Sequence, residues 1–284
     1  MATTAATRLR LGVIGDPVAH SLSPALHQPA LDLLGIPATY ERWHTPAEDL
    51  PTRVASLRAL DVLGANVTVP YKLAVMGLID EVSESARRAG AVNTIVNQQG
   101  RLTGESTDIH GFRVALTEAV GDRGVGMAVI LGAGGAARAA VLALEAMGVS
   151  RIYVVNRNRE RAAQLQSDLA PAPVDIAAPD EAWFSKHLAG ADLLVNATSL
   201  GWKSGETPLD PRWLVMLPAS ATVFDMTYRE TVLLRAARER GLQAADGLGM
   251  LVHQGARAFT LFTGQPAPVQ IMLESAHTAQ AQTT

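Results

Sequence analysis

The sequence contains no cysteine, and this absence excludes several kinds of structure and site. A chain without thiols forms no disulfide framework, holds no cysteine-ligated metal and has no thiol nucleophile. It has no basic excess either, because 24 Lys+Arg stand against 27 Asp+Glu, and a nucleic-acid-binding surface needs such an excess. No apolar run approaches the roughly 20 residues that a membrane-spanning helix requires. We therefore expect a protein that binds neither nucleic acid nor membrane.

The rest of the composition is that of an ordinary globular protein. Of 284 residues, 48% are hydrophobic and 18% are charged, which is enough apolar material for one large domain or two smaller ones. Residues 1–7 lack the apolar region of a signal peptide, and both this segment and residues 278–284 are small and polar, so we expect both to be unstructured. These features favour a cytoplasmic metabolic enzyme.

Strand-like and helix-like segments alternate, which predicts an α/β fold with a mostly parallel sheet. In the first half, strands are expected at residues 9–15, 40–44 and 64–70, helices at 24–34 and 50–60, and a hairpin at 91–97 and 98–104. In the second half, strands are expected at residues 127–131, 151–156, 193–196 and 222–224, and helices at 136–147 and 159–169. Ser23 is expected to cap the first helix and Gly35 to end it. Boundaries near residues 107–111 and 246–249 would let the last helices pack onto the first half.

A glycine-rich turn follows the strand at residues 127–131. Residues 132–137 match the dinucleotide-binding pattern G-x-G-x-x-G/A, with Ala137 in the third place. The glycines allow a tight turn and a close approach of the backbone to a pyrophosphate, which the N–H groups at the helix start then bind. A glycine-rich turn without a ligand is the alternative, but the strand before it and the helix after it favour the binding site.

The next strand distinguishes between the two nicotinamide cofactors. NAD-binding sheets usually end this strand in Asp or Glu, which binds the ribose 2′-hydroxyl. Here the strand ends in Asn156-Arg157-Asn158-Arg159, and Arg161 follows. A guanidinium binds a 2′-phosphate through charge-assisted hydrogen bonds, so we predict NADP rather than NAD.

Further polar clusters follow other predicted strands, at the sheet edge where open α/β folds bind ligands. They lie at residues 21–23, 66–72, 91–94, 107–108 and 196–201. Taken singly, each has a structural explanation: Ser23 could cap a helix, Lys72 could be a solvated charge and Asp108 could cap another helix. Their order along the chain is more informative than any one of them.

Together with the glycine turn, these clusters resemble the shikimate dehydrogenase family over nearly the whole chain. The segments that carry the resemblance are residues 15–24, 66–72, 90–94, 132–138, 156–157, 196–199 and 245–254. The resemblance implies NADP-dependent reduction of 3-dehydroshikimate to shikimate, a step of chorismate and aromatic amino-acid biosynthesis. It also implies two α/β domains: a substrate domain with a mixed, mostly parallel sheet, from residues 1–108 plus 247–284, and a Rossmann-like NADP domain from residues 109–246.

The resemblance also implies a role for each matching residue. Lys72 and Asp108 would be the catalytic pair. The substrate would be held by Ser21, Ser23, Asn66, Thr68, Asn93, Tyr228 and Gln254. The cofactor would be held by Gly132, Ala133, Gly134, Gly135, Ala136, Asn156, Arg157, Asn158, Arg161, Thr198, Ser199, Gly247 and Met250.

The chemistry of such a reaction suits this set of residues. A small polyhydroxylated carboxylate has little apolar surface, so several placed hydrogen bonds must orient it. Negative charge develops on the carbonyl oxygen during hydride transfer, and the ammonium of Lys72 can stabilise it and deliver a proton. Asp108 would orient Lys72 while it binds a hydroxyl.

The chain departs from the family pattern at three positions. Ser106 stands where Asn is frequent, Leu22 where Lys is frequent, and Trp202 where Met is commoner. A quinate/shikimate or aminoshikimate dehydrogenase remains an alternative, as does a catalytically silent NADP-binding module. The seven histidines show no metal-ligand spacing, so we expect no metal. Monomer and homodimer both remain open.

Overall fold

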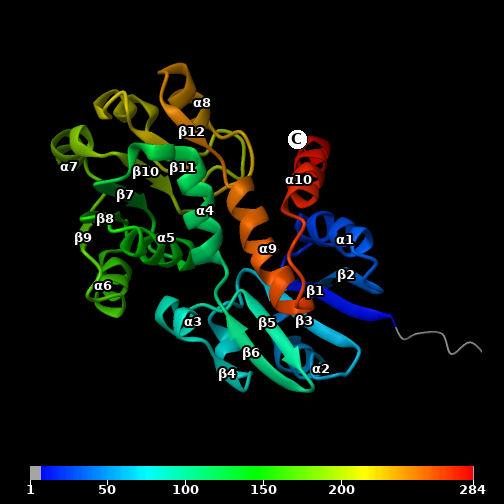
Figure 1. Cartoon of the computed structure of the whole chain (residues 1–284). Coiled ribbons are helices and arrows are strands. Elements are labelled where there is room, and N and C mark those ends of the chain that lie inside the picture. The colour runs from blue at the N-terminus through cyan, green and yellow to red at the C-terminus, as the bar shows by residue number, and fades with distance from the viewer. Residues whose placement is uncertain (1–7, 284) are drawn as a thin grey trace, which may run out of the picture. The chain divides into compact units, whose positions relative to one another are not determined.

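The computed structural model describes residues 8–283, which form two compact units. Unit 1 comprises residues 8–107 and 254–283, and unit 2 comprises residues 108–253. Each unit contains its own six-stranded sheet, and Figure 1 shows the strands of unit 1 in blue to cyan and those of unit 2 mainly in green to yellow. Among the described helices, none is long and apolar enough to cross a membrane.

The sheet of unit 1 is mixed. Its order is β2-β1-β3-β5-β6-β4, in which β1 pairs in parallel with β2 and β3, and β5 runs antiparallel to β3 and β6. The strands are β1 (Leu9–Gly15), β2 (Ala38–His44), β3 (Val62–Val67), β4 (Glu81–Val82), β5 (Thr94–Gln98) and β6 (Arg101–Glu105). Because β1 and β3 are parallel neighbours, their carboxyl ends lie at the same edge of the sheet. Open α/β folds bind ligands at this edge.

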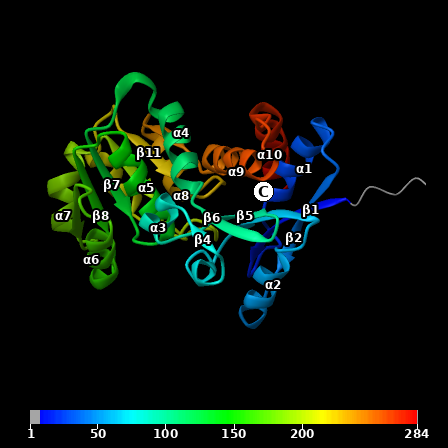
Figure 2. The same ribbon diagram turned by 60° about the horizontal axis from the view of Figure 1, so that its bottom comes forward.

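Helices cover both faces of this sheet. Figure 2 shows α1 and α10 on one face and α2 on the other. Side chains alternate between the faces, as in any strand: Leu11 and Val13 point one way, whereas Ile14 joins the α2 side with Val54 and Leu57. The helices of unit 1 are α1 (Ser23–Leu33), α2 (Leu50–Ser56), α3 (Glu84–Ala89) and α10 (Val269–Thr283), together with the part of α9 (Leu248–Thr263) from residue 254 onward.

The sheet of unit 2 is wholly parallel, with the order β12-β11-β10-β7-β8-β9. Counted from β7, this is the strand order 3-2-1-4-5-6 of the doubly wound nucleotide-binding fold, with its switch point between β7 and β10. The strands are β7 (Met127–Leu131), β8 (Arg151–Val155), β9 (Val174–Ala177), β10 (Leu193–Asn196), β11 (Thr222–Asp225) and β12 (Gln243–Ala245). The helices are α4 (Asp108–Val120), α5 (Gly135–Ala146), α6 (Arg159–Asp168), α7 (Glu181–His187), α8 (Val232–Glu239) and the first residues of α9.

The predicted fold class is confirmed, and three of the predicted strands, β1, β7 and β10, have the predicted bounds. The prediction that Ser23 caps the first helix is wrong: Leu22 holds the cap position without a side-chain bond, and the Ser23 hydroxyl bonds to Ser21 instead. Gly35, at φ +63°, ends α1 as expected. The second helix is shorter than predicted and ends at Ser56.

The sequence predicted that both ends of the chain are unstructured, and the structure tests this prediction only at the C-terminus. Residues 1–7 lie outside the described residues. The C-terminal prediction is wrong, because α10 continues to Thr283 and packs along α1. Its alanines favour a helix, and Ala276 is wholly buried, so tertiary packing overrides the polar composition.

The two units divide between residues 107 and 108 and between residues 253 and 254, whereas the sequence predicted boundaries after residues 108 and 246. The first crossing falls between Thr107 and Asp108, which places Asp108 at the start of unit 2. The second falls between His253 and Gln254, within α9, whereas the expected boundary precedes that helix.

Candidate functional site

The loop after β1 brings two predicted substrate-binding serines together. The Ser21 hydroxyl donates to Ser23 Oγ at 3.1 Å, and the Ser23 backbone N–H donates to Ser21 Oγ at 3.3 Å. The Arg42 guanidinium, on β2, donates from Nε and Nη2 to the Ser21 carbonyl at 3.1 and 2.8 Å. The loop is therefore tied to the sheet, and its two hydroxyls lie side by side.

Asn66, near the end of β3, has a bond on each polar atom of its amide. Its Oδ1 accepts a 2.7 Å hydrogen bond from the Tyr40 hydroxyl. Its Nδ2 donates to Thr94 Oγ1 at 3.1 Å and to the Asn93 carbonyl at 3.3 Å. Asn66 is 5% exposed, so these bonds form largely out of contact with water.

Asn93 continues the same network toward α9. Its Nδ2 donates to Thr107 Oγ1 at 2.9 Å and to Gln254 Oε1 at 3.2 Å. Its Oδ1 accepts from the Thr107 backbone N–H at 2.7 Å and from Thr94 Oγ1 at 3.2 Å. Thr107 also bonds to Gln254, from Oγ1 to Oε1 at 3.4 Å.

These bonds form two sets of hydrogen-bonded side chains within unit 1, which we together call the polar ladder. The first set is Ser21 and Ser23, and the second is Tyr40, Asn66, Asn93, Thr94, Thr107 and Gln254. Five of the predicted substrate-binding residues belong to it. The sequence prediction did not include Tyr40, Thr94 and Thr107 among them, although Thr94 and Thr107 stand within the polar clusters from which the other residues were taken.

Thr68 and Lys72 lie in the turn after β3. The Thr68 N–H donates to the Ile14 carbonyl at 2.9 Å, which fixes this turn to the end of β1. The Val92 N–H donates to the Lys72 carbonyl at 2.8 Å, which places the Lys72 backbone one residue from Asn93. Lys72 belongs to unit 1 and Asp108 to unit 2, so their pairing remains a prediction.

In unit 2 the glycine turn lies between β7 and α5, as the sequence predicted, and the strand order places it at the switch point of the sheet. Gly132 has φ +107°, and a Cβ there would lie 3.0 Å from Thr198 Cγ2 and 3.1 Å from the Ala197 carbonyl oxygen. Only glycine fits this position without strain. Thr198 is itself fixed, because its N–H and hydroxyl both donate to Asn196 Oδ1, at 3.0 and 2.7 Å.

The predicted arginine cluster also reaches this turn. Arg161 donates from Nε to the Ala133 carbonyl at 3.1 Å, and its Nη2 would lie 3.7 Å from a Cβ on Gly134. Asn158 caps α6 by accepting from the Arg161 N–H at 2.8 Å. Arg157, in the loop before α6, and Arg161 are both exposed. The α5 N-terminus, the glycine backbone and the arginines together fit a phosphorylated dinucleotide.

A buried carboxylate, which sequence reasoning missed, ties the neighbouring loops together. Asp225, at the end of β11, is wholly buried and accepts bonds from Asn196 Nδ2 at 2.9 Å, from the Thr227 N–H at 3.0 Å and hydroxyl at 2.9 Å, and from the Thr231 hydroxyl at 2.8 Å. Burial raises the pKa of this carboxyl, although the hydrogen bonds oppose the shift.

Among the remaining predicted residues of unit 2, Tyr228, Ser199 and Gly247 lie on loops, and Met250 lies in α9. Tyr228 meets Trp202 edge to face at 4.8 Å between ring centroids, and burial raises its pKa. Gly247 donates its N–H to the Thr227 carbonyl at 2.9 Å, and a Cβ there would lie only 2.2 Å from the Met226 carbonyl oxygen. Ser199 and Met250 lie in unit 2 as well, and Met250 is buried in α9.

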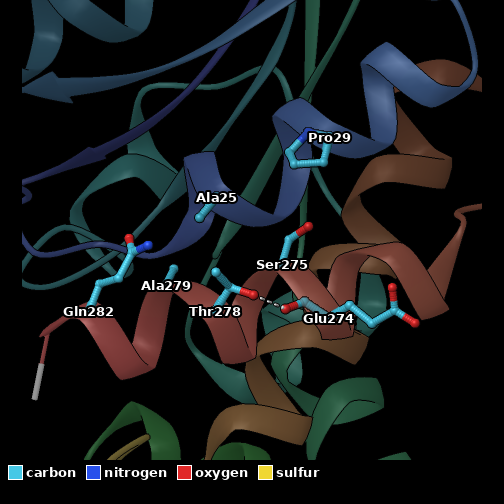
Figure 3. Close-up of a pocket in the computed structure, with 7 residues that line it drawn as sticks. All are labelled: Ala25, Pro29, Glu274, Ser275, Thr278, Ala279 and Gln282. Carbon is cyan, nitrogen blue, oxygen red and sulfur yellow. Dashed lines mark hydrogen bonds between the residues drawn. The ribbon is translucent and has the colours of Figure 1, made fainter.

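A separate surface groove of about 480 Å³ runs between α1 and α10 and contains no predicted site residue (Figure 3). It is lined by Ala25, Pro29, Glu274, Ser275, Thr278, Ala279 and Gln282. Within residues 8–283 there is no group of three or more His, Asp and Glu side chains that could hold a metal ion.

The strand order of unit 2 and the glycine turn at its switch point define a two-unit α/β protein with a Rossmann-like dinucleotide-binding domain. Comparison with known proteins identifies the family. The model of the shikimate dehydrogenase substrate binding domain matches residues 13–95, that of shikimate/quinate 5-dehydrogenase matches residues 117–202, and that of the shikimate 5′-dehydrogenase C-terminal domain matches residues 247–277. The chain belongs to the shikimate dehydrogenase family.

Curated relatives and solved structures agree with this assignment. The shikimate dehydrogenase (NADP(+)) of Symbiobacterium thermophilum is 46% identical over 278 residues, which cover 94% of this chain and 92% of the relative. A shikimate 5-dehydrogenase of Thermus thermophilus, solved with NADP(H) and shikimate, has a TM-score of 0.85 at 40% identity and covers 95% of this chain and 99% of its own. A quinate dehydrogenase of Corynebacterium glutamicum, solved with NAD, has a TM-score of 0.87 at 34% identity, with coverages of 95% and 99%.

Proposed function

We propose that the chain catalyses the NADP-dependent interconversion of 3-dehydroshikimate and shikimate, a step of chorismate and aromatic amino-acid biosynthesis. The observation that carries the proposal is the polar ladder, whose two hydrogen-bonded sets contain five predicted substrate-binding side chains in one unit. The relatives named above, one of them solved with NADP(H) and shikimate, support the same reaction. Unit 1 would bind the substrate and unit 2 the cofactor.

The ladder suits an anionic polyol. Ser21 and Ser23 offer two adjacent hydroxyls and a rigid loop to the substrate carboxylate. Asn66, Thr68, Asn93 and Gln254, with Tyr228 from unit 2, would bind the ring hydroxyls. Since most of these amides are already held by neighbours, little side-chain entropy is lost when the substrate binds.

Lys72 and Asp108 would carry the proton. In the reduction, the Lys72 ammonium donates a proton from Nζ to the carbonyl oxygen as that oxygen gains negative charge; in the oxidation, a neutral Lys72 amine accepts the hydroxyl proton. Asp108, in the first turn of α4, would accept a hydrogen bond from a substrate hydroxyl and orient Lys72.

The cofactor would lie on unit 2. The N–H groups of residues 132–136 and the start of α5 would bind its pyrophosphate, and Asn156, Arg157, Asn158 and Arg161 would bind its ribose and 2′-phosphate. Thr198, Ser199, Gly247 and Met250 would line the remaining contacts. When bound, NADPH would supply the hydride that the carbonyl carbon accepts, and NADP⁺ would take the hydride in the reverse direction. The residues of the chain contribute position and charge.

A spectrophotometric assay tests the proposal. The chain should reduce NADP with shikimate, with a kcat/KM at least tenfold above that with quinate or with NAD. Lys72→Ala should lower kcat by a factor of about 10² to 10⁴ with little change in KM, because its contact strengthens in the transition state. An absorbance change with quinate and NAD but none with shikimate and NADP would contradict the proposal and favour the quinate activity.

A further inference from the structure

We propose that Tyr40 is a positioning residue for the substrate pocket: its buried phenol fixes the Asn66 amide in the orientation that substrate binding needs. This inference depends on the proposed function, because it assigns Tyr40 to the same site. Tyr40 comes from β2, whereas Asn66 lies on β3. The phenol therefore connects two strands of unit 1 that lie on opposite sides of β1.

The strand register explains how these residues come together. Tyr40 stands opposite Leu11, and Asn66 opposite Val13, in the two ladders that flank β1. Leu11 and Val13 are two residues apart, so they and their partners point to the same face of the sheet. The Tyr40 hydroxyl reaches across this face to Asn66 Oδ1 at 2.7 Å.

The direction of each hydrogen bond is determined by the partners. Tyr40 donates its only proton to Asn66 Oδ1. The Asn93 carbonyl, which can only accept, selects the Nδ2 side of the Asn66 amide. Both Nδ2 hydrogens of Asn66 are then engaged, and one lone pair of Oδ1 is left for a ligand. Asn66 thus presents an acceptor to a substrate hydroxyl.

The Tyr40 ring is held by an unusual neighbour. His27 stacks on it with 4.3 Å between ring centroids and 5° between planes, and neither ring nitrogen of His27 has a hydrogen-bond partner. Phe259 and Phe262 surround the histidine at 6.2 Å. His27 is wholly buried and makes no polar contact, so its contribution to the ladder is to fix the plane of the Tyr40 ring. Burial also raises the pKa of Tyr40, which keeps the phenol a donor.

Tyr40→Phe tests the inference, because it removes the hydroxyl and keeps the ring. We expect the KM and the calorimetric Kd for shikimate to rise about tenfold, since the hydrogen bond that orients the Asn66 amide is lost. The Kd for NADP, which unit 2 would bind, should not change, and kcat should fall less than threefold. A purely structural role would lower thermal stability without this separation of substrate affinity from cofactor affinity.

Two further variants make the test decisive. His27→Leu keeps the hydroxyl but removes the stack, and should raise the KM for shikimate about threefold. Val54→Ala, on α2 and outside the ladder, destabilises the same unit and should leave this KM unchanged. An unchanged shikimate KM in both Tyr40→Phe and His27→Leu would overturn the inference, as would an equal rise in Val54→Ala. If the unaltered chain did not bind shikimate at all, the proposed function would fail before the variants were compared.

Discussion

We expect the buried His27 to make unit 1 less stable as the pH falls, and we expect His27→Leu to remove this part of the pH dependence. Its ring is wholly buried, and burial lowers its pKa from 6.5 to about 3. In the unfolded chain the imidazole binds a proton below about pH 6.5, whereas in the folded chain it stays neutral down to about pH 3. Protonation of His27 therefore does not reduce the free energy of unfolding above pH 6.5. As the pH falls from 6.5 toward 3, the unfolded chain binds the proton and the free energy of unfolding decreases.

The size of the effect follows from these two pKa values. Between pH 8 and pH 5.5 the unfolded state gains about 1.4 kcal/mol from protonation of His27, and the folded state gains almost nothing. His27→Leu lacks the titrating group, so the free energy of unfolding should fall by about 1.4 kcal/mol less over the same pH range in the variant than in the unaltered chain. Other groups titrate in both proteins and cancel in this difference.

Urea unfolding at the two pH values, followed by hydrogen exchange of peptides from β1 and β3, measures the stability of unit 1 separately from that of unit 2. Val54→Ala serves as the matched control: it lowers stability but retains His27, and its pH dependence should equal that of the unaltered chain. Parallel pH dependences in the unaltered chain and in His27→Leu would refute the reasoning, because they would mean that the buried ring does not discriminate against the proton.

Three further predictions concern unit 2. Asp225→Ala leaves the Asn196 amide and the Thr227 and Thr231 hydroxyls without their acceptor. In urea titrations it should lower the free energy of unfolding by about 3 kcal/mol, and Asp225→Asn should have an intermediate effect. Equal stability of the unaltered chain and both variants would contradict the role of this carboxylate. Gly132→Ala should lower the free energy of unfolding, measured by thermal unfolding, by about 2 kcal/mol, because its Cβ would meet Thr198 and the residue has a positive φ. A Cβ at Gly135 would meet no atom within 4 Å, so Gly135→Ala should change this free energy by less than about 1 kcal/mol. Equal losses in the two variants would disprove the steric argument. Arg157→Ala should raise the KM for NADP about 10- to 100-fold and leave that for NAD unchanged, and an unaltered preference between the two cofactors would remove Arg157 from the 2′-phosphate site.

The sequence predicted those elements whose signal is local. The strands β1 and β7 are apolar runs that end at glycine, and the turn after β7 has a spacing that few other structures require. The strand β9 was missed because it is only four residues long and follows two prolines of the segment 171–173. The prediction that Ser23 caps α1 is wrong because Leu22 occupies the cap position and the Ser23 hydroxyl bonds to Ser21. Such competition between local hydrogen bonds is not contained in a capping rule.

The site shows the same division between local and distant signals. Serine, asparagine and lysine residues within compact motifs could be selected from the sequence. Tyr40 and Asp225 could not, because their roles come from bonds to residues 26 and 29 positions away that only strand register brings into contact. A tyrosine in a strand is ordinarily read as packing, and nothing near Tyr40 in the sequence indicates its partner.

The composition of the polar ladder has a consequence for how the pocket responds to its surroundings. Its members are hydroxyls and amides, with one phenol whose pKa burial raises, so none of them gains or loses a charge near neutrality. The pattern of donors and acceptors that a ligand meets in unit 1 is therefore the same in mildly acidic and mildly alkaline solution. Any change of turnover with acidity must then originate in ionisable groups outside this set or in the ligand itself.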